Sequence, residues 1–158
     1  MANYTATLET QLPAAAVFAY LSDFSNTEEW DPGTVQAERV DDGPIREGSE
    51  FRLVATFLGR ESVISYRVVE YDPPSIVSFR GENSTVVSLD RIAVAAADTG
   101  SRIKYDAELT LKGPLKLADP LLAVAFERVG DRALAGMRAT FARKQASESE
   151  RVNVARSG

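Results

Sequence analysis

Few residues in this chain could do chemistry, and Asp90 is the most unusual of them. It lies in a segment whose residues alternate in polarity, on the side that also carries Ile92 and Val94. A carboxyl group on a buried face is costly unless it is paired or neutralised. Asp90 could act as a general base or orient a ligand. Alternatively, it could form a structural ion pair with Arg128 or Arg132, and we favour this reading because such pairs also perturb acidities.

Several classes of catalytic site are excluded by composition, because the chain contains neither cysteine nor histidine. Disulfides, thiolate metal sites, and the Ser-His-Asp and Cys-His triads are therefore impossible. No cluster of Asp and Glu residues has the spacing of a metal-binding loop. We expect no metal and no cofactor, and we assign no catalytic residue.

The overall charge and hydropathy limit the possible partners. The chain has 158 residues, 44% of them hydrophobic, which suits one packed domain. It has 18 basic and 23 acidic residues, a net charge of −5. This balance argues against nucleic acid and against adhesion to an anionic membrane. Without a signal peptide or a run of about 18 apolar residues, we expect a cytoplasmic protein with no stable membrane insertion. The oligomeric state stays open.

The elements that must position Asp90 are mainly strands. Alternation over 3–10 predicts a first strand, and residues 13–22 predict a short amphipathic helix. A second short helix follows and ends at Trp30-Asp31-Pro32-Gly33, where Pro and Gly interrupt it. Six more strands are separated by turns rich in Gly, Pro, Asn and Asp, which favours an antiparallel meander. They are predicted near 34–41, 49–58, 61–71, 75–81, 84–96 and 101–112.

A long C-terminal helix is predicted over residues 120–143, where apolar residues recur every three or four positions. Gly130 and Gly136 interrupt this pattern, either to make room for a ligand or, alternatively, to allow close packing on the sheet or a gentle bend. Residues 145–158 are polar and lack periodicity, so we expect a disordered tail. The predicted organisation is therefore one domain over 1–144 and a tail over 145–158.

Tight hairpins determine which side chains share a face of the sheet. The predicted turns at 59–60 and 98–99, around Asn83 and around Pro73 agree in parity. They give these opposed pairs: Leu53 with Tyr66, Asp90 with Ala107, Ile92 with Tyr105, and Phe79 with both Val86 and Val68.

One face of the predicted sheet is nearly all apolar, so it should line a pocket for a small hydrophobic ligand. Its tyrosines could offer hydroxyls to the ligand or bond to neighbouring groups, and Trp30 could gate the pocket or simply fill the core. The predicted ligand-binding residues are Trp30, Phe51, Leu53, Ala55, Tyr66, Phe79, Ser88, Asp90, Ile92, Tyr105, Phe126 and Met137.

Several motifs occur together in a characteristic order. They are the helix at 15–24, Trp30-Asp31-Pro32, Glu70-Tyr71-Asp72-Pro73-Pro74, Gly100-Ser101-Arg102-Ile103, Leu111-Lys112-Gly113-Pro114 and the final helix. Over residues 3–143 the chain resembles the polyketide cyclase/dehydrase branch of the START-like, or SRPBCC, superfamily. The resemblance implies an α+β helix-grip fold: a bent seven-stranded antiparallel sheet around a long C-terminal helix, with a cavity between them. It also implies binding of lipids, polyketides, hormones or other apolar molecules, and it carries over no catalytic motif.

Three functions follow as hypotheses. The favoured one is binding or carriage of a small hydrophobic molecule, lipid or polyketide-like, in an internal cavity. The second is a cyclase or dehydratase that positions a polyketide-like chain while Asp90 or a tyrosine moves protons. The third is a regulatory interaction module without ligand. Its contact surface would be the apolar residues of the outer sheet face, namely Val54, Leu58, Val63 and Val69.

Overall fold

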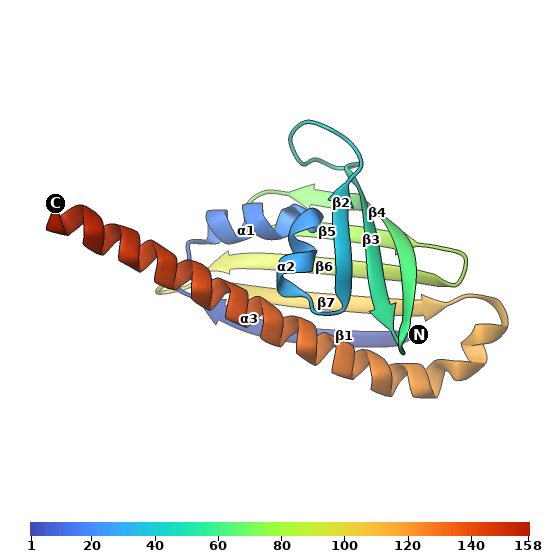
Figure 1. Ribbon diagram of the computed structural model, residues 1–158. Helices are drawn as coiled ribbons and strands as arrows, with labels where there is room; N and C mark the ends of the chain where they lie inside the picture. The colour runs from blue at the N-terminus through green and yellow to red at the C-terminus, as the bar shows by residue number, and fades with distance from the viewer.

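A bent seven-stranded antiparallel sheet forms one layer of the protein, and its inner face is covered by helices (Figure 1). The computed structural model describes the backbone of residues 1–158 and all side chains except those of residues 118 and 119. The strand order is β1-β7-β6-β5-β4-β3-β2. The elements are β1 (Ala2–Thr10), α1 (Ala14–Ser22), η1 (Phe24–Asn26), α2 (Thr27–Trp30), β2 (Thr34–Arg39), β3 (Glu50–Phe57), β4 (Arg60–Asp72), β5 (Ile76–Glu82), β6 (Val86–Ala96), β7 (Ser101–Leu111), η2 (Gly113–Ala118) and α3 (Asp119–Ser157).

The predicted faces of the sheet are confirmed. On β7, Ile103 and Tyr105 are buried, while Lys104 between them is exposed. Since side chains alternate along a strand, this pattern leaves one face for the core and one for water. The predicted β6–β7 register is also confirmed, with Asp90 opposite Ala107. The helix-grip fold class therefore holds.

The β3–β4 register differs from the prediction by two residues. Leu53 lies opposite Ile64, whereas Tyr66 lies opposite Phe51. The hairpin turns at Leu58 and Gly59, which both have positive φ (52° and 77°). A two-residue turn of this kind, type I′, matches the twist of the strands. The predicted turn lay one residue later, so the predicted pair was wrong although its face was right.

Phe79 has one predicted partner and one unpredicted partner. It lies opposite Val68 on β4, as expected, but opposite Asp90 rather than Val86 on β6. The cause is the loop at Asn83, whose side-chain Oδ1 accepts hydrogen bonds from the backbone N–H groups of Thr85 (2.8 Å) and Val86 (2.9 Å). These bonds close the hairpin two residues later than predicted, again without changing the face.

The short helices fill much of the space on the inner face of the sheet. Phe24 of η1 stacks on Phe79, with ring centroids 4.0 Å apart. Trp30 of α2 lies edge-on to Tyr105 at 6.0 Å and is only 3% exposed. Trp30 is thus a core residue in this structure.

The two glycines of α3 mark close approaches to the rest of the domain. A Cβ on Gly130 would lie 2.5 Å from the Tyr4 ring, and one on Gly136 would lie 2.0 Å from the Trp30 carbonyl oxygen. Of the two explanations offered by the sequence, close packing is therefore the correct one. These contacts hold α3 against β1 and α2.

The predicted disordered tail is wrong, because α3 continues to Ser157 and its last turns project beyond the sheet (Figure 1). From residue 146 onward every residue is exposed. Apolar periodicity predicts only helices that bury one face. Residues 146–157 bury no face, so the periodicity test could not detect this part of the helix. It is rich in Ala, Arg, Glu and Ser and has no Gly or Pro before Gly158, so helix propensity suffices to continue the helix.

Candidate functional site

The buried apolar side chains form two separate clusters. The larger one joins the short helices and most of the sheet to Leu134, Met137 and Phe141 of α3. The smaller one lies near the start of α3 and comprises Ala2, Leu109 and Leu122. It is flanked by half-buried Phe57, Val86, Leu111 and Phe126. A domain usually has one contiguous core and smaller satellite clusters, and the three-residue cluster is a satellite of the larger one.

Small or polar side chains lie between the two clusters. On β6, Ser88 and Asp90 lie between Val86 of the smaller cluster and Ile92 of the larger one. On β3, Ala55 lies between Leu53 and Phe57. We call these positions the intercluster layer and define it by Ala55, Tyr66, Ser88, Asp90, Tyr105 and Ala107. Tyr105 belongs to the larger cluster, and Tyr66 and Ala107 pack against that cluster. Ala55 lies four residues along β3 from Phe51, the residue opposite Tyr66.

Asp90 is at the centre of the layer's hydrogen bonds. Its carboxyl group is buried, with the residue 8% exposed. The Tyr105 hydroxyl donates to Oδ1 at 2.7 Å, and the Ser88 hydroxyl donates to Oδ2 at 2.9 Å. Both hydroxyls are themselves buried. Paired hydroxyl donors offset part of the cost of burying a carboxylate.

The predicted ion pair of Asp90 is wrong. Among the side chains that the structure describes, no lysine or arginine lies within ion-pair distance of Asp90, and Arg128 and Arg132 are exposed. The buried face of α3 carries Leu134 and Met137, and the rotation of the helix that buries these residues turns the two arginines toward solvent. Asp90 is therefore a buried carboxyl group held by hydroxyls alone.

A second carboxyl group, Asp31, influences the layer. Burial raises the pKa of Asp90 from 3.8 to about 6, against the opposing effect of its two hydroxyl partners, and the charge of Asp31 adds to the rise. The pKa of Asp31 is also raised by burial, although the Gly33 N–H and the Thr34 hydroxyl bond to it at 2.9 Å each. A carboxyl group with a pKa near 6 can exchange a proton at physiological pH.

The tyrosines of the layer hold their protons firmly. Burial raises the pKa of Tyr105 and of Tyr66 well above the ordinary value, and the negative charge of Asp90 raises both further. They are hydroxyl donors at neutral pH and not phenolates.

The structure brings Ser88 and Tyr105 into hydrogen-bond contact with Asp90. Five of the predicted ligand-binding residues belong to the intercluster layer: Ala55, Tyr66, Ser88, Asp90 and Tyr105. Six others pack in the larger apolar cluster: Trp30, Phe51, Leu53, Phe79, Ile92 and Met137. Phe126 packs against the smaller cluster. Contact of any of them with a ligand stays a prediction.

Sequence reasoning did not identify Asp31 as a site residue. It used Trp30-Asp31-Pro32 only as a helix stop. A usable signal was present, because an Asp followed closely by Gly33 and Thr34 is typical of side-chain capping of the local backbone. Such capping holds the Asp31 carboxylate in one place.

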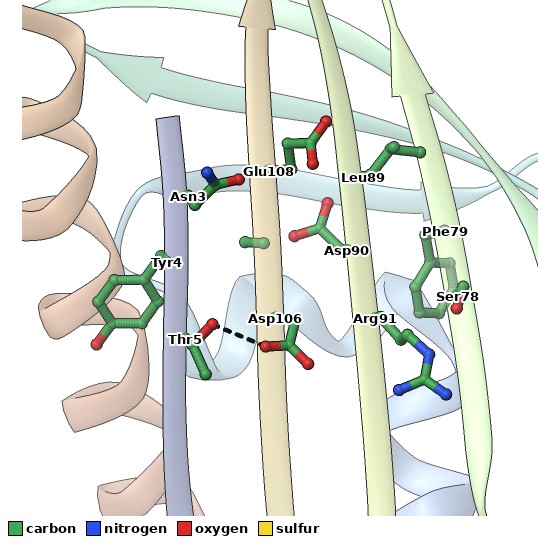
Figure 2. A pocket seen from close by; sticks show the side chains of 11 residues that line it. Asn3, Tyr4, Thr5, Ser78, Phe79, Leu89, Asp90, Arg91, Asp106 and Glu108 are labelled. Carbon is green, nitrogen blue, oxygen red and sulfur yellow. Dashed lines mark hydrogen bonds between the residues drawn. The ribbon is translucent and has the colours of Figure 1, made fainter. Parts of the chain in front are cut away.

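A groove of about 380 Å³ crosses the outer face of the sheet (Figure 2). Its sides are outward-facing residues of β1, β7, β6 and β5, among them Thr5 and Asp106, which share a hydrogen bond of 2.8 Å. Its floor is strand backbone, because Phe79 and Asp90 also line it while their side chains are buried. This groove is a feature of the surface and not of the interior.

A second cavity, of about 530 Å³, lies between α1 and the C-terminal half of α3. Val17 and Phe141 supply apolar walls, and Arg143 and Lys144 lie at its rim. Lys144 Nζ sits 4.3 Å from the centre of the Tyr20 ring. The groove reaches Asp90 and Ala107 of the intercluster layer from the outer face of the sheet, and the second cavity shares no residue with the layer. An enclosed ligand pocket between the sheet and α3 therefore stays a prediction.

The described part of the chain contains no group of three or more Asp or Glu side chains arranged to hold a metal ion. Within the same described residues, no helix is both long and apolar enough to cross a membrane.

The fold is shared with solved structures that differ widely in sequence. The Zhui aromatase/cyclase from Streptomyces sp. R1128 superposes with a TM-score of 0.76 at 16% identity, over 90% of this chain and 94% of that one. A START superfamily protein from Mycobacterium smegmatis gives 0.76 at 12% identity, over 89% and 97%. A protein from Thermus thermophilus gives 0.75 at 14% identity, over 90% and 98%. At these identities the likeness shows the fold alone.

The sequence itself identifies the family. No curated protein matches the chain. A family model described as polyketide cyclase/dehydrase and lipid transport matches residues 1–142, which include every strand and most of α3. The chain therefore belongs to the polyketide cyclase/dehydrase and lipid transport family.

Proposed function

We propose that the protein binds a small hydrophobic molecule in the intercluster layer, between the sheet and α3. The observation that carries this proposal is the separation of the two apolar clusters by Ala55 on β3 and by Ser88 and Asp90 on β6. Large apolar residues at these positions would join the two clusters. Ala55, Ser88 and Ala107 are smaller than such residues, and in this proposal the difference in volume accommodates an apolar guest.

The chemistry of the layer suits such a guest. Ligand sites are mostly apolar, with a few polar groups that fix orientation. Here Ser88, Asp90 and Tyr105 supply the polar groups, and the two clusters supply apolar walls on either side. The smaller cluster includes half-buried Phe57, Leu111 and Phe126, so its apolar surface is incompletely covered. This end of the layer, beside the first turns of α3, is the natural entrance. The family, which covers lipid transport, supports the same proposal.

A second candidate is an enzyme of cyclase or dehydratase type. It is favoured by one observation, namely that Asp90 is a buried carboxyl with a pKa of about 6, bonded to the Tyr105 hydroxyl. Such a group can take a proton from a bound substrate and return it. In that case the layer binds substrate as in the first proposal, and Asp90→Asn would abolish turnover while binding remains.

Binding of a neutral apolar dye, Nile red, tests the proposal. Ala55→Trp places a large ring in the layer, and we expect it to weaken the affinity at least about tenfold by occupying the ligand's volume. Val54→Trp is the matched control, because the neighbouring residue on β3 faces outward. Fluorescence titration gives the affinities, and circular dichroism checks that both variants fold.

The outcomes separate the remaining explanations. Equal affinity in folded Ala55→Trp and wild-type protein would mean that the dye binds elsewhere, for example in the second cavity, between α1 and the C-terminal half of α3. A wild-type protein that binds no apolar probe would contradict the proposal and favour a ligand-free interaction module. Leu58, Val63 and Val69, the residues predicted for that module's contact surface, are exposed.

A further inference from the structure

Asp90 has hydrogen-bonding capacity that the protein does not use. An ionised carboxylate offers about four acceptor sites on its two oxygens. The Tyr105 and Ser88 hydroxyls each fill one of them. Within the described part of the chain, no other side-chain or backbone donor bonds to Asp90. Unfilled acceptor sites on a buried carboxylate are costly, so a bound molecule that donates a hydrogen bond there gains affinity.

The charges that face the intercluster layer are negative. Asp31 acts on Asp90 with a charge of the same sign. The basic side chains of the neighbouring strands point outward and form ion pairs at the surface, as Arg91 does with Glu70 (3.4 Å) and Lys104 does with Asp106 (3.6 Å). A ligand carboxylate in the layer would therefore meet two carboxyl groups and no described counter-charge. Like charges brought together out of water repel strongly.

We propose that the layer selects apolar molecules whose polar end donates a hydrogen bond, such as an alcohol or a phenol, and rejects those that end in a carboxylate. This inference rests on the proposed function and adds the ligand's chemical class. In the bound state the ligand hydroxyl donates to a free acceptor site of the Asp90 carboxylate, and its apolar body lies between the two apolar clusters. A free fatty acid or a polyketide acid loses this bond and is repelled.

Two naphthalene probes that differ only in the polar group test the selection. We expect 2-naphthalenemethanol to bind the wild-type protein at least about tenfold more tightly than 2-naphthoate at pH 8, where Asp90 is ionised. Asp90→Asn removes the charge and keeps the shape, so the ratio of the two affinities should fall toward one. Asp106→Asn is the matched control. It removes an equal charge from the outer face, where Asp106 accepts a hydrogen bond from Thr5 (Figure 2), and it should keep the wild-type ratio.

A second measurement needs no variant. The ratio of the affinity for 2-naphthalenemethanol to that for 2-naphthoate should also fall in the wild-type protein between pH 8 and pH 5, because Asp90 takes up a proton. The titratable groups that interact with Asp90 are Asp31, Tyr66 and Tyr105. The buried residues of α3 that pack in the larger cluster, Leu134, Met137 and Phe141, carry no charge. Protonation of Asp31 acts in the same direction, and both tyrosines stay protonated throughout.

The outcomes distinguish a failure of the proposed ligand binding from a failure of the proposed selection for hydrogen-bond donors. If neither probe binds the wild-type protein, the proposed function itself fails. If 2-naphthoate binds as tightly as the alcohol or more tightly, the function stands and the selection is overturned. A ratio unchanged in folded Asp90→Asn, or unchanged between pH 8 and pH 5, overturns it as well.

Discussion

Replacing Asp90 with asparagine should change how the stability of the protein depends on pH. The folded protein raises the pKa of Asp90 from 3.8 to about 6 because the carboxyl group is buried. Between these two values the folded state keeps a proton that the unfolded state releases. The contribution of Asp90 to the free energy of unfolding is therefore greatest below about pH 4, falls as the pH rises toward 6, and is constant above that. Asparagine does not titrate, so the free energy of unfolding of the variant does not fall in this way as the pH rises.

The size of the effect follows from the shift. Each pKa unit corresponds to about 1.4 kcal/mol of difference between the protonation states, so moving the pKa from 3.8 to about 6 corresponds to roughly 3 kcal/mol. The asparagine Oδ1 keeps an acceptor for Tyr105, but its amide group replaces the acceptor of the Ser88 hydroxyl. That exchange costs about 0.5–1.5 kcal/mol at every pH. This cost lowers the free energy of unfolding of Asp90→Asn by the same amount at every pH, so it does not change how that free energy depends on pH.

Urea unfolding at several pH values between 4 and 8 measures the effect, and the difference between variant and wild type is the informative quantity. The wild-type curve alone also contains the opposite contribution of Glu82, whose pKa is lowered to about 2 by Lys112 and Arg80. We expect the difference to rise in favour of Asp90→Asn by roughly 2 kcal/mol from pH 4 to pH 7, because part of the full shift already falls below pH 4. Asp106→Asn on the outer face should show no such rise. A flat or falling difference for Asp90→Asn would mean that Asp90 is solvated or paired with a cation.

Two further predictions concern α3. Gly136→Ala should destabilise the protein by about 2 kcal/mol or more, and by more than Gly130→Ala. The new methyl group would meet the Trp30 backbone oxygen at 2.0 Å in the first case and the Tyr4 side chain at 2.5 Å in the second. Both changes gain the same helix propensity, about 1 kcal/mol, so equal or reversed losses in urea unfolding would refute the packing argument. A chain that ends at Gln145, which accepts a hydrogen bond from the Gln11 N–H, should keep its melting temperature within a few degrees, because residues 146–158 are exposed. It should also lose helical circular dichroism signal, and a large drop in melting temperature would show that the domain extends beyond residue 145.

Side-chain period and turn chemistry together predicted which face each strand buries. Lys104 and Tyr105 illustrate this, because adjacent residues of a strand must point to opposite sides. Moving a turn by one residue shifts the pairing by two residues, and moving it by two shifts the pairing by four. Both are even numbers, so the buried face is unchanged, and this is why the faces were right where the Leu53 and Phe79 pairings were wrong. The exact pairing depended on positive φ at Leu58, a conformation that leucine rarely adopts and that its type does not signal.

The amino-acid sequence by itself determined the class of fold, the inward placement of Asp90 and the absence of histidine and cysteine chemistry. These are properties of local period and composition, which act over a few residues. The partner of Asp90 was decided only by the tertiary structure. Rotation of α3 and its close approach to Trp30 at Gly136 turn Arg128 and Arg132 toward water, while the β6–β7 register brings Tyr105 and Ser88 to the carboxyl group. Packing of a whole helix on a sheet depends on contacts between residues far apart in the chain, and no local pattern encodes that geometry.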